Sequence, residues 1–145
     1  MLRASAWTLF LMGCLHIMGH LTGARAFTNP PDEPTRAIAK AMMGYTVRDF
    51  PIDRTIASLY FGFSLTFSAF SLLAGALVLL TSTALKDDLP ALRPILRAYT
   101  GGLLVLTAIS MNYFIWPPTI CMLVAFGFAA LAMARLRREI RTPKP

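Results

Sequence analysis

The sequence predicts an all-α fold: a four-transmembrane-helix bundle with a short amphipathic helix in the first extracytoplasmic loop. Of the 145 residues, 56% are hydrophobic and only 14% are charged, and both values differ from those of ordinary soluble domains. The hydrophobic residues form four long blocks separated by charged segments. Each block is long enough to cross about 30 Å of hydrocarbon as a helix. Helices satisfy their own backbone hydrogen bonds in lipid, so four helices are the expected architecture.

The chain forms a single predicted membrane domain, 1–145, and its four spans cover residues 4–22, 56–81, 98–116 and 118–134. Pro117 and Pro118 suit the end of one helix and the start of the next. The third and fourth spans should therefore be antiparallel neighbours. The aromatic residues at this turn, Tyr113, Phe114 and Trp116, are typical of an aromatic belt at a membrane surface.

The distribution of Lys and Arg predicts the orientation. Nine lie at the N-terminus, in the loop 85–97 and in the basic tail 135–145, whereas five lie in the first loop. By the positive-inside rule, both termini should be cytoplasmic in a multi-pass protein of the bacterial inner (plasma) membrane. The net charge of +7 does not indicate nucleic-acid binding, because the basic residues flank the spans. The tail should instead meet anionic lipid headgroups of the bilayer.

The first loop contains a predicted helix at about residues 35–44, within DEPTRAIAKAMMGY (32–45). Acidic residues and a proline open this helix, and Gly44 can close it. Ile38, Met42 and Tyr45 share one face, while Arg36 and Lys40 share the other. We expect an amphipathic helix that lies on the outer membrane surface or over the bundle.

Two processing signals compete with a retained first span. Ala24, Arg25 and Ala26 resemble a signal-peptidase site, and cleavage there would leave a chain that begins at Phe27. LMGC (11–14) loosely resembles a lipoprotein signal. We expect the first span to be retained, with Cys14 and Cys121 as buried thiols rather than a disulfide.

The first span contains two histidines in the stretch GCLHIMGHLTG (13–23). At 100° per residue, His16 and His20 share one face with Gly13, Gly19 and Gly23, while the large apolar side chains occupy the other. Because small residues mark helix contacts in membranes, the histidines should face the bundle. Similar stripes of small or polar residues occur in the second span (Ser64, Ser68, Ser71, Gly75), the third (Gly101, Val105, Ala108, Asn112) and the fourth (Gly127, Ala130, Ala134).

The predicted topology places several polar groups near the outer face. Ionisable residues within spans point to function, so we expect a ligand-binding site there. Its candidate residues are His16, His20, Asn112, Tyr113, Ser64 and Ser68, with Asp53 nearby. The sequence contains no nucleophile elbow, phosphate-binding loop or pair of membrane carboxylates. It therefore favours a non-enzymatic module that binds a small ligand, a partner subunit or a second copy of the chain, and it identifies no cofactor.

Three alternatives remain open. Because His16 and His20 are four residues apart, both rings can reach one metal ion, so a membrane enzyme or redox subunit with histidine ligands to metal or haem is the runner-up. A proton-linked transporter component is a third class. Alternatively, both histidines only form hydrogen bonds across helices, to Ser64, Ser68 or Asn112.

The segment AMMGYTVRDFPIDRTIASLYFGFSLTFSAFSLLAGALVLL (41–80) resembles a family of small, uncharacterised bacterial four-helix integral membrane proteins. The shared features are a Gly-Phe pair at the start of the second span, here Gly62 and Phe63, followed by a small residue, here Ser64. The histidine of the first span, His16 within GCLHIMGH, is also similar. The resemblance implies a four-helix inner-membrane protein and no particular activity.

Overall fold

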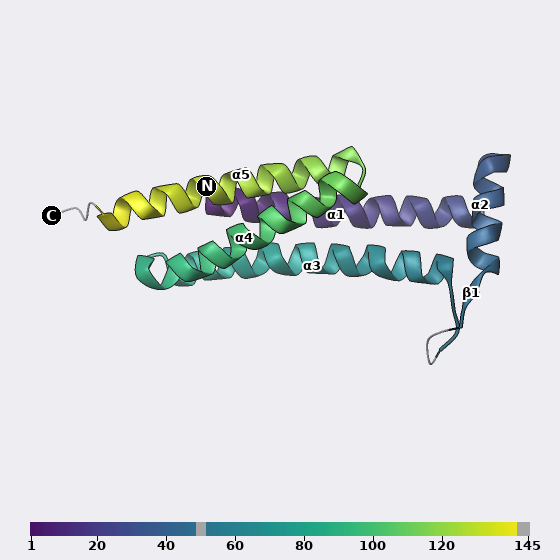
Figure 1. The fold of residues 1–145 in the computed structure, drawn as a ribbon, viewed down its shortest axis with the longest axis horizontal. Helices are drawn as coiled ribbons and strands as arrows, with labels where there is room; N and C mark the ends of the chain where they lie inside the picture. The colour runs from purple at the N-terminus through teal and green to yellow at the C-terminus, as the bar shows by residue number, and fades with distance from the viewer. Residues whose placement is uncertain (49–51, 142–145) are drawn as a thin grey trace. The chain divides into compact units, whose positions relative to one another are not determined.

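The computed structural model describes residues 1–48 and 52–141 (Figure 1). Residues 49–51, within the segment of the family resemblance, and 142–145, at the end of the basic tail, lie outside the described part. The described elements, in chain order, are α1 (Leu2–Thr28), α2 (Glu33–Gly44), β1 (Thr46–Val47), β2 (Arg54–Thr55), α3 (Ile56–Ala84), α4 (Leu89–Tyr113) and α5 (Trp116–Arg141).

The predicted all-α class is confirmed, and α1, α3, α4 and α5 are each long and apolar enough to cross a membrane. These four helices define a multi-pass membrane protein. β1 and β2 form a small antiparallel ladder that was not predicted, in which Thr46 pairs with Thr55. This ladder precedes α3.

Several helices extend beyond the predicted spans. α1 continues past Arg25 to Thr28, and α4 begins at Leu89 and so includes Arg93 and Arg97. The Asp88 carboxylate starts α4 by accepting a hydrogen bond from the Ala91 backbone N–H at 3.0 Å. The difference has a simple cause: an apolar run marks the part of a helix that can lie in hydrocarbon, whereas the helix itself continues to its capping residues.

The chain consists of two compact units. Unit 1 comprises Met1–Met12 and Ser71–Pro145, and unit 2 comprises Gly13–Phe70. Unit 1 therefore contains the start of α1, the end of α3, and all of α4 and α5. Unit 2 contains the rest of α1 and α3, together with α2 and the two strands.

Within unit 1, α4 and α5 pack side by side after a tight turn, as the two prolines predict (Figure 1). Their buried faces are not the predicted ones, because Gly101, Val105, Ala108 and Asn112 of α4 are exposed. α4 instead buries another face, with Leu96 and Leu103 toward its start and middle and the smaller Thr107 and Ser110 toward its end. α5 contributes the fully buried Ala125 and Ala129. The buried residues of α5 are Thr119, Met122, Ala125, Ala129, Met133 and Leu136.

Gly75 marks a close approach of α3 to α1 in unit 1. A Cβ atom at Gly75 would lie 2.8 Å from the Ala6 carbonyl oxygen and 3.3 Å from the Phe10 backbone nitrogen. Ser71 and Gly75 are both buried. The second half of the predicted stripe on the second span, Ser71 and Gly75, is therefore a helix contact, and Phe10 beside it is half-buried.

A buried serine joins three helices of unit 1. Ser5 of α1 is 0% exposed. Its hydroxyl donates to the Ala125 carbonyl of α5 at 2.7 Å and lies 2.9 Å from the Tyr99 hydroxyl of α4. Neither Ser5 nor Tyr99 was predicted as a contact, because neither belongs to a stripe of small or polar residues along its helix.

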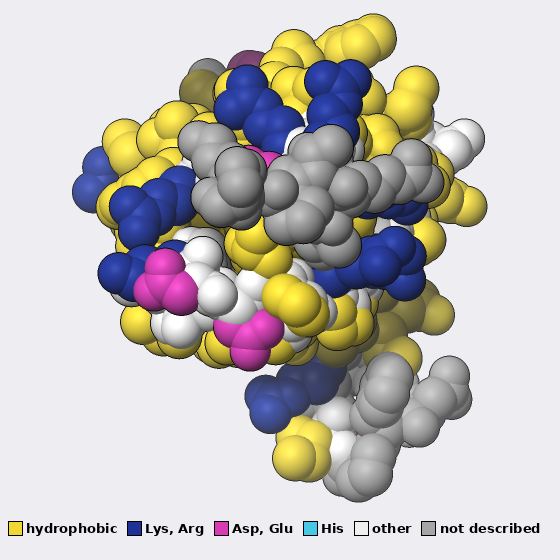
Figure 2. Space-filling model, turned by 90° about the vertical axis from the view of Figure 1, so that its left-hand side faces the viewer, with side chains coloured by type: hydrophobic (Ala, Val, Ile, Leu, Met, Phe, Trp, Pro, Cys, Tyr) yellow, Lys and Arg dark blue, Asp and Glu magenta, His cyan; other side chains and the backbone are white. Residues whose placement is uncertain are grey.

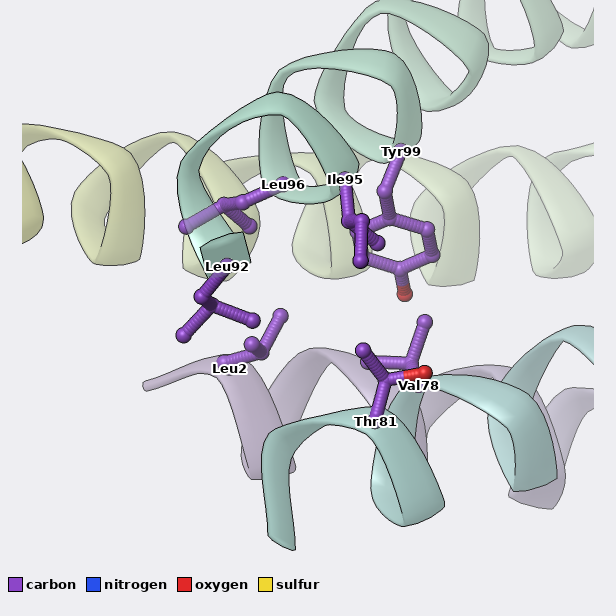
Figure 3. A pocket seen from close by; sticks show the side chains of 7 residues that line it. All are labelled: Leu2, Val78, Thr81, Leu92, Ile95, Leu96 and Tyr99. Carbon is purple, nitrogen blue, oxygen red and sulfur yellow. The ribbon is translucent and has the colours of Figure 1, made fainter. Parts of the chain in front are cut away.

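A small apolar cavity lies beside this contact (Figure 3). Its volume is about 10 Å³, close to the least space that one water molecule occupies. The side chains around Tyr99 are therefore densely packed. The lining side chains are Leu2, Val78, Thr81, Leu92, Ile95, Leu96 and Tyr99.

Candidate functional site: the histidine cluster

The histidines lie in unit 2, where the second half of α1 meets the first half of α3. His16 and His20 are half-buried and one turn apart, whereas Cys14, Met18 and Leu21 on the other side of α1 are exposed. The predicted face of the first span is thus confirmed for the histidines. We use the name histidine cluster for His16, His20, Phe61, Ser64 and Phe67.

The glycines near the histidines do not have the role expected of them. A Cβ atom at Gly19 or Gly23 would meet nothing within 4 Å. These glycines therefore do not bring two backbones together. The imidazole and aromatic rings, which are larger, make the contact between the helices.

His16 bonds across to α3. Its Nε2 atom lies 3.2 Å from the Ser64 hydroxyl oxygen, and either group can donate, depending on the tautomer of the ring. The edge of the imidazole also meets Phe67, with ring centroids 5.0 Å apart at 69°. The hydrogen bond to Ser64 is the one that a purely structural role predicts. Ser68, in contrast, is buried and donates to the Ser64 carbonyl of its own helix at 3.1 Å.

His20 is only partly satisfied. Its ring meets Phe61 edge to face, with centroids 5.2 Å apart at 86°. Its Nδ1 atom is buried and has no hydrogen-bond partner among the described residues. Buried polar atoms almost always have a partner in the protein or in bound water. His20 therefore leaves one buried ring nitrogen without a hydrogen-bond partner among the described residues.

Aromatic rings continue from His20 toward the end of α1. Phe27 contacts Phe61 edge to face, with ring centroids 5.1 Å apart. It also stacks on Tyr60, with centroids 6.4 Å apart and an angle of 16° between the ring planes. Sequence reasoning missed Phe27, Tyr60 and Phe61 as site residues. Their positions in the sequence do not distinguish them from other aromatic residues, because an apolar ring in a span is most often simply buried or lipid-facing.

The loop helix α2 has a buried face different from the predicted one. Ala39 is 1% exposed and Met42 is half-buried, whereas Ile38 and Tyr45 are exposed. Ala39 is small enough to let α2 pack closely, so the packed face is rotated toward it. The larger apolar side chains of α2 remain uncovered.

A helix cap and an exposed ion pair lie at the start of α2. The Asp32 carboxylate accepts a hydrogen bond from the Thr35 backbone N–H at 2.8 Å, and hydrogen bonding to the Thr35 side chain and backbone holds the pKa of Asp32 below its usual value. Arg36 forms an ion pair with Glu33 at 2.6 Å. α2 is therefore a well-formed helix in the connection between α1 and α3.

The remaining predicted site residues have other surroundings. Asn112 and Tyr113 belong to unit 1 and are exposed, Tyr113 by 83%. The Asn112 amide donates to the Ala108 carbonyl of its own helix at 2.8 Å. Asp53 is exposed just before β2. Of the predicted set, the structure brings His16 into hydrogen-bond contact with Ser64.

The described residues contain no group of three or more His, Cys, Asp or Glu side chains that could hold a metal ion. The cluster offers two imidazoles, and His16 Nε2 is already engaged with Ser64. A metal or haem at this position would need further ligands from outside these residues.

Comparisons with family models, with curated proteins and with solved structures found no match to this chain. Its function must therefore be argued from the geometry of the site.

Proposed function

We propose that the protein is a non-enzymatic membrane module that binds a small ligand or a partner subunit at the histidine cluster. The observation that supports this proposal best is the buried Nδ1 atom of His20, which lacks a partner among the described residues. An unsatisfied polar atom inside a membrane protein is costly. A bound molecule with a hydrogen-bonding group would remove that cost.

The surroundings of His20 indicate what kind of molecule would fit. Phe61 of α3 supplies aromatic surface against the His20 ring, and Phe27 of α1 in turn contacts Phe61. Ligand sites are typically apolar walls with a few placed polar groups. The expected ligand is accordingly a mostly apolar molecule, a lipid or quinone for example, with one polar group that bonds the imidazole.

The proposed setting is the inner membrane, with both termini in the cytoplasm. The uneven distribution of Lys and Arg supports this orientation. In it, α2 lies at the outer surface as a helix in the first loop, and its exposed Ile38 and Tyr45 contact the headgroup region. Tyr60 and Phe27 belong to an aromatic belt at the same depth.

The test compares small molecules that co-purify with three forms of the full-length chain in mild detergent. The forms are the parent, His20→Phe and the control Met18→Leu, whose side chain is 63% exposed on the opposite side of α1. Mass spectrometry of solvent extracts should find one compound, or native mass spectrometry one partner, with the parent and with Met18→Leu. His20→Phe should lose it. Equal retention by all three forms, or nothing bound to the parent, would contradict the proposal.

The second candidate is a redox or metal-dependent membrane subunit, which the four-residue spacing of His16 and His20 favours. A visible absorption spectrum and a metal analysis of the same preparation test it. A haem band or stoichiometric metal that disappears in His20→Phe would support this alternative over the first proposal. A colourless and metal-free preparation would eliminate it.

A further inference from the structure

Unit 1 has an open groove at the end where α4 begins and α5 ends. Its volume is about 190 Å³, far larger than that of the cavity near Tyr99. Its walls are largely aliphatic: Leu89, Leu92 and Leu96 of α4, and Ala132 and Leu136 of α5. The charged side chains that line it, Arg135 and Glu139, belong to the last turns of α5.

Basic side chains surround this end of unit 1 (Figure 2). The described ones are Arg3, Lys86, Arg93, Arg97, Arg135, Arg137 and Arg138, and the only described acidic residues of unit 1 are Asp87, Asp88 and Glu139. Two of these carboxylates are engaged, since Asp88 caps α4 and Asp87 lies 3.7 Å from Lys86. The region is therefore electropositive.

Arg135 is the basic side chain that lines the groove. It has no ion-pair partner in the described part of the chain. Arginine binds phosphate through several parallel hydrogen bonds.

We propose that this groove binds one anionic phospholipid of the membrane, with an acyl chain against the leucines and the phosphate at Arg135. α4 and α5 are long and apolar enough to span the bilayer, and the groove opens at their ends, where headgroups lie. An apolar channel beside cations matches both parts of a phospholipid. This inference concerns unit 1 and is independent of the function proposed for the histidine cluster.

The binding experiment uses native mass spectrometry of the full-length chain with added phosphatidylglycerol or with phosphatidylcholine of the same chains. The parent should bind phosphatidylglycerol more tightly. Arg135→Gln should weaken phosphatidylglycerol binding about fivefold, as expected for one cation near a phosphate. The matched control is Arg25→Gln, an exposed arginine of unit 2, which should not change it.

The groove itself is tested by Ala132→Phe, which fills it, against Ala134→Phe, which places the same ring on the exposed side of α5. Ala132→Phe should reduce binding of both lipids, and Ala134→Phe should not. If Ala132→Phe does not fold, competition with glycerol phosphate tests the groove in the parent instead. Glycerol phosphate has the headgroup but no acyl chains, so it should not displace bound phosphatidylglycerol. Displacement would contradict a role for the groove in binding the acyl chain. If the parent and Arg135→Gln bind phosphatidylglycerol with equal affinity, the whole proposal is overturned.

Discussion

Ser5 of unit 1 and His20 of unit 2 are both polar residues on α1, but they differ in what surrounds them. The Ser5 hydroxyl is fully buried and has two partners, the Ala125 carbonyl and the Tyr99 hydroxyl. The buried Nδ1 of His20 has none among the described residues. A satisfied buried group fixes helix packing, whereas an unsatisfied one has bonding capacity left for a ligand. Of these two residues, His20 is therefore the better candidate for binding a ligand.

Among the variants that test this comparison, Gly75→Leu in unit 1 should lower the free energy of unfolding most. Its Cβ would lie 2.8 Å from a backbone oxygen of α1, so the helices must separate. We expect the free energy of unfolding to fall by about 3 kcal/mol, the upper range for an overpacked core. Unfolding by SDS in mixed micelles measures it.

The control is Gly62→Leu on the same helix, where an added Cβ meets nothing within 4 Å. It should leave the unfolding free energy nearly unchanged. Equal losses in the two variants would mean that Gly75 does not mark the contact between α1 and α3.

Ser5→Ala should have the next largest effect. It leaves the Tyr99 hydroxyl and the Ala125 carbonyl without their shared partner. The expected loss of unfolding free energy is about 1 to 2 kcal/mol. Thr22→Val is the comparison, because Thr22 is exposed and bonds only to its own helix. A loss no greater than that of Thr22→Val would show that the buried serine does not stabilise unit 1.

These residues also show how far the sequence could predict the structure. Long apolar blocks determine which segments become helices, and the prolines at 117 and 118 mark the first turn of α5. The faces of α4 and α5 could not be predicted, because a stripe of small residues exists whether or not another helix packs on it. Asn112 was placed in the site by such a stripe and is exposed.

The histidine cluster was predictable in part. Imidazole in a span restricts the face of α1, and a serine one helix away is a natural partner for His16. The rings that surround His20 were not predictable, because Phe61 is distinguished from Phe63 and Phe70 only by its position on α3. Phe63 and Phe70 are in fact exposed.

In unit 2, His16→Ala should destabilise the protein modestly. The change removes the bond to Ser64 and the ring contact with Phe67. Hydrogen bonds between membrane helices contribute about 0.6 kcal/mol, with a maximum near 1.7, so the loss should be about 1 kcal/mol. SDS unfolding again measures it. A loss as large as that of Gly75→Leu would make the cluster a packing element rather than a site.

The smallest effect concerns the helix cap of α2. Hydrogen bonding to Thr35 lowers the pKa of Asp32, so the cap stabilises α2 above the ordinary pKa of aspartate. This stabilisation is lost as the pH falls through the lower pKa of the folded state. The Thr35 amide resonance in NMR should report a titration midpoint below that of an unstructured aspartate. Asp32→Asn should abolish the titration, and a midpoint at or above the ordinary value would contradict the cap.

The most direct test of the distinction between Ser5 and His20 measures ligand retention and unfolding free energy in His20→Phe and Ser5→Ala. His20→Phe keeps an aromatic ring against Phe61, so it should retain nearly full stability and lose the co-purifying molecule. Ser5→Ala should lose stability and keep the molecule. The account is contradicted if His20→Phe retains the molecule, or if the two variants lose stability and ligand together.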